Sequence, residues 1–309
     1  MRNETAHSEF RIPNSELNMR LLFTKMVGTG NDFIVVDRRA GRAHVLRHDW
    51  RAISRALCDR HRGIGADGLL VLEPSSAARA RMRVFNPDGS EAQMCGNGAR
   101  CVALYEATSN KQQATAANRV TIETKAGVLS ATVRGERVAL RMTDPTGLQL
   151  HGVVRVGAKQ LRFGFVNTGV PHVVVPVATL DDIDVSRLGR TLRYHRRFSP
   201  KGTNVNFIQA DARHRLRIRT YERGVEGETL ACGTGVTASA IIHALSASNG
   251  RATATSHRVE VKTRSGDRLT VSFTVASKGD TLRMSDVVLE GPARRVFDGA
   301  VEWPLERAR

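Results

Sequence analysis

Two copies of a Cys-Gly-x-Gly unit, 137 positions apart, limit most strongly what this chain can fold into. The first copy is Cys95–Gly98 and the second is Cys232–Gly235. Each copy follows a β-branched strand pattern and a loop, and each precedes an apolar helical pattern, over 99–109 and 236–246. The repeated order predicts two related halves facing one another, and ligand sites favour the interface between such halves.

The two units also agree upstream of their cysteines. A glutamate stands four residues before each cysteine, at Glu91 and Glu228. When the units are aligned by their cysteines, the preceding strand patterns end at matching offsets, which carry Phe85 and Asn86 in the first half and Glu222 and Arg223 in the second.

Short β-branched segments separated by turn residues dominate the rest of the chain, as is typical of strands and hairpins. Helical spacing is rarer: it occurs over 48–60 and after each Cys-Gly-x-Gly unit. Strands therefore dominate the expected structure, with few helices, in two related halves.

Composition excludes several classes of protein. With 309 residues, of which 41% are hydrophobic, the chain can fill two cores. No apolar run approaches the ~20 residues that a bilayer crossing needs, so we expect no membrane association. Residues 1–19 lack a secretory signal and are expected to form a flexible N-terminal extension. Four cysteines are too few for a disulfide scaffold, which predicts reduced thiols in the cytoplasm.

The formal charge of +17 makes nucleic acid a candidate binding partner. The cations are spread along the whole chain, however, and most are arginines rather than lysines. Neither local concentration, at 38–51 or at 187–197, interleaves aromatic residues or forms a nucleic-acid-binding motif. We therefore expect solvated faces and no specific nucleic-acid binding.

A thiol at the start of a helix suits acid–base chemistry. Unpaired N–H groups and the helix dipole stabilise negative charge there, which favours a carboxylate ligand and is expected to lower a cysteine pKa. Two such thiols on opposite sides of one carbon could remove a proton from one face and return one to the other. Inversion of a stereocentre without a cofactor needs two bases of this kind.

A buried structural thiol is the alternative for each cysteine. We adopt it for Cys58 and Cys101, which lie inside helical patterns. A zinc site would require further ligands at suitable spacing, and Cys95, Cys101 and Cys232 form no Cys-x-x-Cys pair, so no metal is predicted.

The chain resembles the diaminopimelate epimerase family, whose members act without pyridoxal phosphate and belong to a two-cysteine superfamily of amino-acid epimerases and racemases. The resemblance runs from about Leu21 to Val301. It is carried by six segments in family order, which are 23–37, 58–70, 83–101, 167–175, 202–207 and 221–235. It implies an isomerase that interconverts LL- and meso-2,6-diaminopimelate for lysine and peptidoglycan precursor synthesis, without a cofactor.

The same resemblance implies roles for individual residues. Cys95 and Cys232 match the two acid–base cysteines, and His172 and Glu222 match residues that support them. The matching substrate-binding residues are Asn31, Asn86, Gly96, Asn97, Asn204, Glu222, Arg223, Gly233 and Thr234. Chemically, an arginine can hold a carboxylate with two hydrogen bonds and a glutamate can pair with an ammonium group.

The resemblance also implies the fold, an α/β (α+β) protein with two pseudo-symmetric domains, each a mainly antiparallel sheet wrapped around a central helix. The active site would lie in a hinged cleft between the domains. The first domain would span 20–141 and 292–309 and carry Cys95, and the second would span 142–291 and carry Cys232. Homodimers occur in the family, so a homodimer is a further expectation, with diaminopimelate as the small-molecule partner.

Two positions depart from the family pattern. Many relatives carry asparagine where this chain has Val170, and some carry glutamine at Gly68, so contacts to the distal part of the substrate are in doubt. The nearest alternative is a proline or hydroxyproline epimerase, but these resemble Met-Cys-Gly-His-Gly at the first motif. A phenazine-type isomerase would lack the paired cysteines. A non-enzymatic anion or nucleic-acid binder would use the glycine turns without needing thiols.

Overall fold

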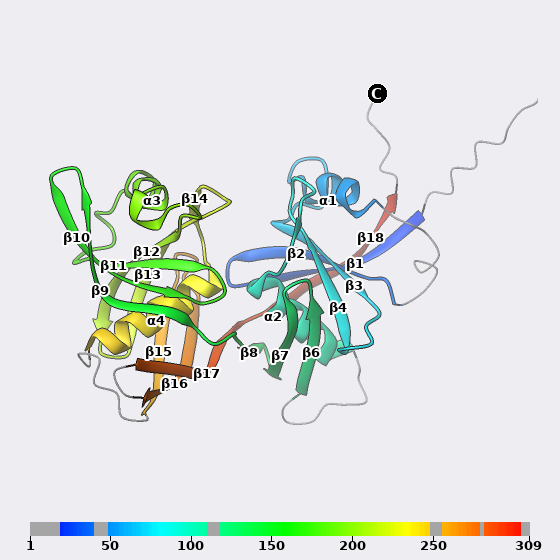
Figure 1. The fold of residues 1–309 in the computed structure, drawn as a ribbon. Coiled ribbons are helices and arrows are strands. Elements are labelled where there is room, and N and C mark those ends of the chain that lie inside the picture. The colour runs from blue at the N-terminus through cyan, green and yellow to red at the C-terminus, as the bar shows by residue number, and fades with distance from the viewer. Residues whose placement is uncertain (1–18, 40–48, 110–117, 248–254, 279–280, 304–309) are drawn as a thin grey trace, which may run out of the picture.

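The computed structural model describes residues 19–39, 49–109, 118–247, 255–278 and 281–303. Two lobes of strands lie side by side, and each surrounds one long helix (Figure 1). The helix is α2 (Gly96–Ser109) in the first lobe and α4 (Gly233–Ala247) in the second. The predicted two-domain α+β class is confirmed. Residues 1–18 of the expected extension lie outside the described residues, and Met19 begins the first strand.

The first half contains a short helix, α1 (Trp50–Cys58), and eight strands. These strands are β1 (Met19–Gly28), β2 (Asn31–Asp37), β3 (Gly68–Glu73), β4 (Ala80–Phe85), β5 (Glu91–Ala92), β6 (Asn118–Thr124), β7 (Gly127–Arg134) and β8 (Arg137–Arg141).

The second half adds a helix that the sequence patterns did not reveal, α3 (Val185–Arg193), and the short 3-10 helix η2 (Arg196–Phe198). Its strands are β9 (Thr146–Val156), β10 (Lys159–Asn167), β11 (Pro171–Pro176), β12 (Asn204–Ala212), β13 (Arg215–Glu222), β14 (Gly227–Thr229), β15 (Thr255–Lys262), β16 (Arg268–Lys278) and β17 (Thr281–Pro292). The last strand, β18 (Arg294–Trp303), pairs with β1 in the first half.

The order of strand pairing repeats between the halves. In the first half β2 and β3 are parallel, β4 pairs antiparallel with β3 and β5, and β4 and β6 are parallel. In the second half β11 and β12 are parallel, β13 pairs antiparallel with β12 and β14, and β13 and β15 are parallel. This correspondence assigns the paired residues of these strands counterparts in the other half.

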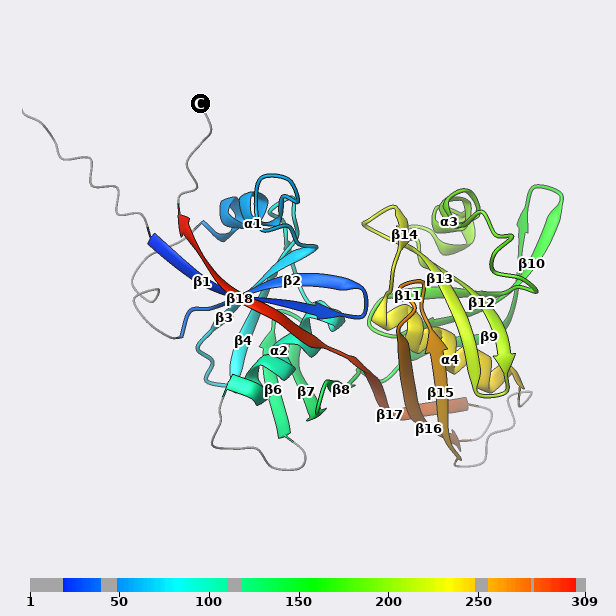
Figure 2. The same ribbon diagram turned by 180° about the vertical axis from the view of Figure 1, so that it is seen from behind.

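One strand joins the halves. The beginning of β17 pairs with β16, and its end, from Val288 to Pro292, pairs with β8 of the first half. From there β18 runs along β1, so both ends of the described chain lie in the first lobe (Figure 2).

The two long helices are buried because they are apolar on nearly every side. From Val236 to Ile242, α4 exposes almost nothing, and Ala99 to Ala103 of α2 are fully buried. Each helix packs against strands of its own half, and the first turns of the two helices bring their lobes into contact. In the described ranges, no helix is long and apolar enough to cross a lipid bilayer.

Candidate active site

Cys95 stands immediately before the first residue of α2. Its carbonyl accepts the backbone N–H of Ala99 (2.8 Å), and its Sγ accepts the N–H of Gly98 (3.5 Å). The thiol therefore takes the place of a helix N-cap side chain. Gly98 is required for this approach, because a Cβ there would lie 3.0 Å from Leu70 Cδ2.

Cys232 occupies the same place before α4. Its carbonyl accepts the N–H of Val236 (2.9 Å), and its side chain is 9% exposed. The Sγ lies 3.4 Å from Thr234 Oγ1. Both predicted cysteines therefore sit at the N-terminus of the central helix of their half.

The two helix starts meet around one carboxylate. A Cβ at Gly233 would lie 3.9 Å from Asn97 Oδ1, which puts the first turns of α4 and α2 side by side. Burial is the main cause that raises the pKa of Cys95 and of Cys232, and the carboxylate of Glu222, at the end of β13, adds to both shifts; the Cys95 thiol adds a smaller rise at Cys232. The structure therefore brings two thiols and one acid into a single neighbourhood.

Burial decides the protonation of the free site, and here the expectation of lowered cysteine pKa values was wrong. Removal from water raises the pKa of Cys95, and it raises the pKa of Cys232 to about 12. Backbone N–H groups of the first helical turns oppose this rise but do not overcome it. Burial also raises the pKa of Glu222. Both cysteines are therefore thiols at neutral pH.

The strand register corrects one detail of the repeat. Phe85 pairs with Glu91 across β4 and β5, and Tyr221 pairs with Glu228 across β13 and β14. The counterpart of Glu222 is therefore Asn86 and not Phe85, because the second loop is one residue longer than the first.

A buried polar network lies on the α2 side of the site. Asn97 donates from Nδ2 to Asn31 Oδ1 (2.6 Å), and Asn31 donates to Asp67 Oδ2 (2.9 Å). Arg100, which is fully buried, donates from Nη2 to Asn97 Oδ1 and Thr29 Oγ1, both at 2.7 Å. Burial lowers the pKa of Arg100, and its charge lowers the pKa of Cys95. Arg100 was not predicted, because an arginine within a helical pattern is ordinarily exposed to solvent.

A second polar cluster lies on the α4 side. Buried Asn204 accepts the backbone N–H of Arg223 at Oδ1 (2.8 Å) and donates to the Pro171 carbonyl (3.1 Å). His172, adjacent to Pro171 on β11, is fully buried and lies 2.9 Å from Thr234 Oγ1. Burial and the positive charge of Arg223 lower the pKa of His172 to about 3, so the imidazole is neutral.

Asn86 is not hydrogen-bonded to these clusters. Its side chain is exposed and donates to Ser90 Oγ (2.9 Å), and within the described residues it makes no hydrogen bond to another predicted site residue. Gly96, by contrast, lies at the very start of α2, where a Cβ would meet nothing within 4 Å.

The two glutamates that precede the cysteines are held in the same way. Arg83 donates from Nε and Nη2 to the two carboxylate oxygens of Glu91 (2.8 and 3.1 Å), and Lys125 adds a contact of 2.7 Å. Arg219 and Arg264 hold Glu228 through equivalent atoms, with a hydrogen bond of 2.7 Å from Arg219 Nε. Each clamp fixes the loop that leads into a cysteine, and the arginines were not predicted.

Each of the two departures from the family pattern has an asparagine as its counterpart in the other half. Val170 stands in the second half where Asn31 stands in the first, two residues after Thr168 and Thr29 respectively. Gly68 pairs with Phe33 just as Asn204 pairs with His172. Each half therefore contributes one of the two asparagines, Asn31 and Asn204.

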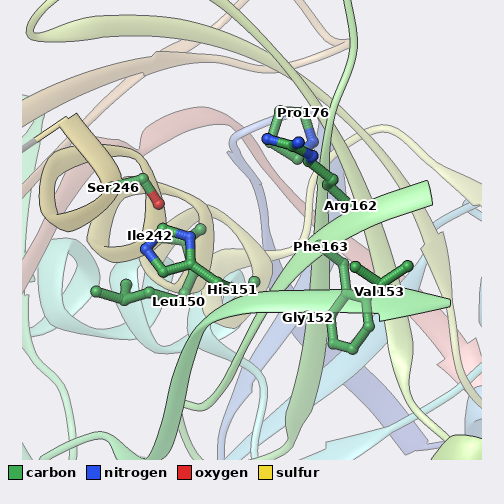
Figure 3. A pocket seen from close by; sticks show the side chains of 10 residues that line it. Leu150, His151, Gly152, Val153, Arg162, Phe163, Pro176, Ile242 and Ser246 are labelled. Atoms are coloured by element: carbon green, nitrogen blue, oxygen red, sulfur yellow. The ribbon is translucent and has the colours of Figure 1, made fainter. Parts of the chain in front are cut away.

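A pocket of about 390 Å³ lies elsewhere, on the second lobe (Figure 3). It is lined mainly by apolar groups from β9, β10 and α4, including Gly152, Phe163 and Ile242. None of the predicted site residues lines it.

Comparison with known proteins agrees with the geometry. A family model described as diaminopimelate epimerase matches residues 23–148 and 164–296, one segment in each half. The diaminopimelate epimerase of Aquifex aeolicus is 40% identical over 286 residues, which cover 90% of this chain and 96% of that protein. That of Archaeoglobus fulgidus is 42% identical over 294 residues, covering 91% and 96% respectively.

Solved structures share the fold at low sequence identity. A hydroxyproline epimerase from Agrobacterium vitis has a TM-score of 0.65 and 18% identity, with 93% of this chain and 94% of that chain covered. A PhzF-family phenazine biosynthesis protein from Bacillus anthracis has a TM-score of 0.64 and 20% identity, covering 92% and 99%. These likenesses show a shared fold, whereas the relatives near 40% identity are more specific. The paired cysteine sites, the repeated architecture and these matches together show that the chain belongs to the diaminopimelate epimerase family, whose members are isomerases.

Proposed function

We propose that Cys95 and Cys232 are the two bases with which this diaminopimelate epimerase inverts one stereocentre of 2,6-diaminopimelate. The observation that carries the proposal is the placement of both thiols at the starts of two facing helices, beside the single carboxylate of Glu222. One thiolate removes the Cα proton of the LL isomer, and the opposing thiol donates its proton to the other face to give the meso isomer. The charges balance, because the first cysteine ends as a thiol and the second as a thiolate.

The helix starts supply the site for the reacting carboxylate. The first-turn groups of Gly96, Asn97, Gly233 and Thr234 would present N–H donors to it, at the positive ends of the two helix dipoles. Negative charge develops next to this carboxylate when the Cα proton leaves. Fixed donors therefore stabilise the transition state more than the ground state.

Glu222 links substrate binding to activation of the thiols. In the free protein its negative charge raises both cysteine pKa values. When the substrate ammonium pairs with Glu222, this charge is neutralised and deprotonation of a thiol becomes easier. The high thiol pKa values of the empty site are therefore compatible with catalysis, since the substrate brings the compensating cation.

The distal end of the substrate requires its own partners. Arg223 would hold the distal carboxylate, and the amides of Asn31, Asn86 and Asn204 would bind the distal amino group and orient the chain. His172 would support Cys232 from within the protein. Asn86 would have to exchange its present hydrogen bond to Ser90 for one to the substrate.

We also propose the division into domains at Arg141 and Pro292, with the substrate bound in the cleft between the domains. The pairing of β8 with β17 at these residues supports a hinge there. Because the mechanism requires free thiols, we expect the protein to act in a reducing compartment such as the cytoplasm. Formation of a homodimer stays a prediction.

The decisive experiment is conversion of LL-diaminopimelate in deuterated water, without added cofactor and with reduced thiols. Two opposed bases predict that early product carries deuterium at the inverted Cα while the remaining substrate keeps its proton. NMR and mass spectrometry of both isomers distinguish these outcomes. Loss of the proton from substrate as fast as product forms would instead indicate one base.

Single substitutions test the two thiols separately. Cys95→Ala and Cys232→Ala should each abolish inversion, because each removes the base from one face. Cys101→Ala is the matched control: this cysteine is buried in α2, and its replacement should leave the rate within a few-fold of the parent. Inversion that survives either active-site change would contradict the proposal.

A further inference from the structure

A continuous line of hydrogen bonds leads from the interior of the second half to Cys232. Thr220 donates from Oγ1 to Asn206 Oδ1 (3.0 Å), and Asn206 Nδ2 lies 3.1 Å from His172 Nδ1. On the other side of the imidazole, Nε2 lies 2.9 Å from Thr234 Oγ1. That hydroxyl lies 3.4 Å from Cys232 Sγ. His172 and Asn206 are both fully buried.

The carbonyl group of Val173 fixes which atoms in this line donate hydrogen bonds and which accept them. Asn206 Nδ2 also contacts the Val173 carbonyl oxygen (3.1 Å), which can only accept. The same nitrogen must therefore donate to His172 Nδ1, and a neutral imidazole then carries its one proton on Nε2. That proton is donated to Thr234 Oγ1, so the hydroxyl hydrogen of Thr234 is free to point at Cys232 Sγ.

The first half shows that the fold does not require this polar line. By strand register and position, the counterparts of His172 and Asn206 are Phe33 and Leu70, which are apolar and buried. The helix glycines confirm the correspondence. A Cβ at Gly98 would meet Leu70 Cδ2 at 3.0 Å, and a Cβ at Gly235 would meet Asn206 Oδ1 at 2.4 Å.

Burying the polar side chains of His172 and Asn206 costs free energy that the apolar side chains of Phe33 and Leu70 avoid. The polar pair is therefore expected to serve a function. The side-chain amide of Asn206 and both ring nitrogens of His172 all have hydrogen-bond partners, which indicates that the network is held in one arrangement. The network ends on only one of the two cysteines. Its function is therefore to be sought at Cys232.

We infer that Asn206 is a positioning residue that fixes His172 as the Nε2–H tautomer, so that the Thr234 hydroxyl donates a hydrogen bond to the Cys232 thiolate. The inference rests on the proposed function, in which Cys232 alternates between thiol and thiolate. His172 acts here as a fixed donor and accepts no proton from the thiol. The two halves consequently stabilise their thiolates differently: Cys95 has the nearby charge of Arg100, and Cys232 has this neutral line of donors.

The tautomer can be measured directly. In protein labelled with ¹⁵N at histidine, the two ring nitrogens give distinct chemical shifts for each tautomer. We expect His172 to carry its proton on Nε2 across neutral pH, and Asn206→Leu to give a mixture of tautomers. An Nδ1–H tautomer, or an imidazolium ion, in the unsubstituted protein would overturn the inference.

The thiolate is tested by the pH dependence of iodoacetamide alkylation, resolved for each cysteine by mass spectrometry. Thr234→Val keeps the shape of the side chain but removes the hydroxyl, and it should raise the apparent pKa of Cys232. The alkylation rate near pH 8 should fall about tenfold, since hydrogen bonds to charged groups are of this strength. Thr234→Ser restores the hydroxyl and should restore the rate.

Cys95 is the internal control in every sample, and its alkylation should change less than twofold. Equal changes at both cysteines, or none at Cys232, would contradict the inference. The charged groups near this line, Glu222 at Cys232 and Arg223 at His172, remain intact in all variants. If Asn206→Leu does not fold, the tautomer of the unsubstituted protein and the comparison of Thr234→Val with Thr234→Ser still decide the inference.

These measurements use no substrate. Failure of the proposed function would appear as inversion by Cys232→Ala, whatever the tautomer. Failure of the present inference would appear in the imidazole shifts and the alkylation rates, even if both cysteines prove essential for inversion.

Discussion

Replacement of Glu91 by glutamine should destabilise the first half of the protein at neutral pH. The Glu91 side chain is 7% exposed and is held by two hydrogen bonds from Arg83 and an ion pair with Lys125. These partners lower the pKa of Glu91 from 4.5 to about 2. Glutamine has a similar shape, but it cannot accept both hydrogen bonds from the guanidinium and carries no charge.

The size of the effect follows from this pKa difference. A lowering of this extent corresponds to about 3 kcal/mol of folding free energy at pH 7. Lys125 is 42% exposed, so water screens part of the interaction and we expect a loss of about 2 kcal/mol. Because the folded-state pKa is depressed, the contribution is complete above pH 4.5 and disappears as the pH falls towards 2. By about pH 3 less than half of it should remain.

Tryptophan fluorescence makes this measurement specific to the first half. The chain has two tryptophans, Trp50 in α1 and Trp303 at the end of β18, and both lie in the lobe that contains Glu91. Urea unfolding at pH 7 and pH 3 gives the free energies. Glu123→Gln is the matched control, because its ion pair with Arg81 is long, at 4.0 Å, and should contribute less than about 1 kcal/mol. Equal losses for the two variants at pH 7, or a Glu91→Gln loss that persists undiminished at pH 3, would refute the reasoning.

Three further predictions concern the site and its support. Cys58 and Cys101 are 2% and 0% exposed, so iodoacetamide at pH 8 should not reach either sulfur in the folded protein, and burial also raises the pKa of both thiols. Labelling of either before unfolding, seen by peptide mass spectrometry, would contradict this. Gly28→Ala would place a Cβ 2.8 Å from the Asn97 carbonyl oxygen and 2.9 Å from Cys101 Sγ. This crowding should lower the free energy of unfolding by about 1–3 kcal/mol and remove most of kcat. An unchanged kcat would show that the start of α2 can shift freely. Val170→Asn adds the amide that Asn31 provides in the other half, and steady-state kinetics should show a lower KM at nearly constant kcat; a fall in kcat alone would place this position elsewhere.

Much of the fold could be predicted because the sequence repeats one structural unit in its two halves. The repeat of Cys-Gly-x-Gly, with its strand before and helix after, identified the two central helices and the two related halves. Helix α3 was missed because its apolar positions, such as Val185 and Leu192, are few and its arginines dominate the pattern. The offset of the second loop also escaped detection, since only the pairing of Tyr221 with Glu228 reveals the extra residue.

The sequence predicted the residue types of the candidate site but not the direction of their pKa shifts. The family resemblance grouped His172 and Glu222 with the two cysteines, and helix-end N–H groups suggested low thiol pKa values. The structure reverses that direction, because removal from water outweighs a few backbone donors. Arg100 and Asn206 were missed for a related reason: in a sequence, a buried polar residue with internal partners looks the same as one exposed to solvent.

The sequence by itself determined that two thiols stand at two helix starts, since glycine placement and helical periodicity are local properties. Only the tertiary structure decided what surrounds them. It placed Glu222 within reach of both cysteines, Arg100 on the side of Cys95, and the line of donors from Asn206 on the side of Cys232. Charge and hydrogen bonding act through space over a few ångströms, and Asn206 on β12 reaches Cys232, and Glu222 on β13 influences Cys95, across long separations along the chain. The two cysteines therefore share one sequence motif but occupy different electrostatic environments.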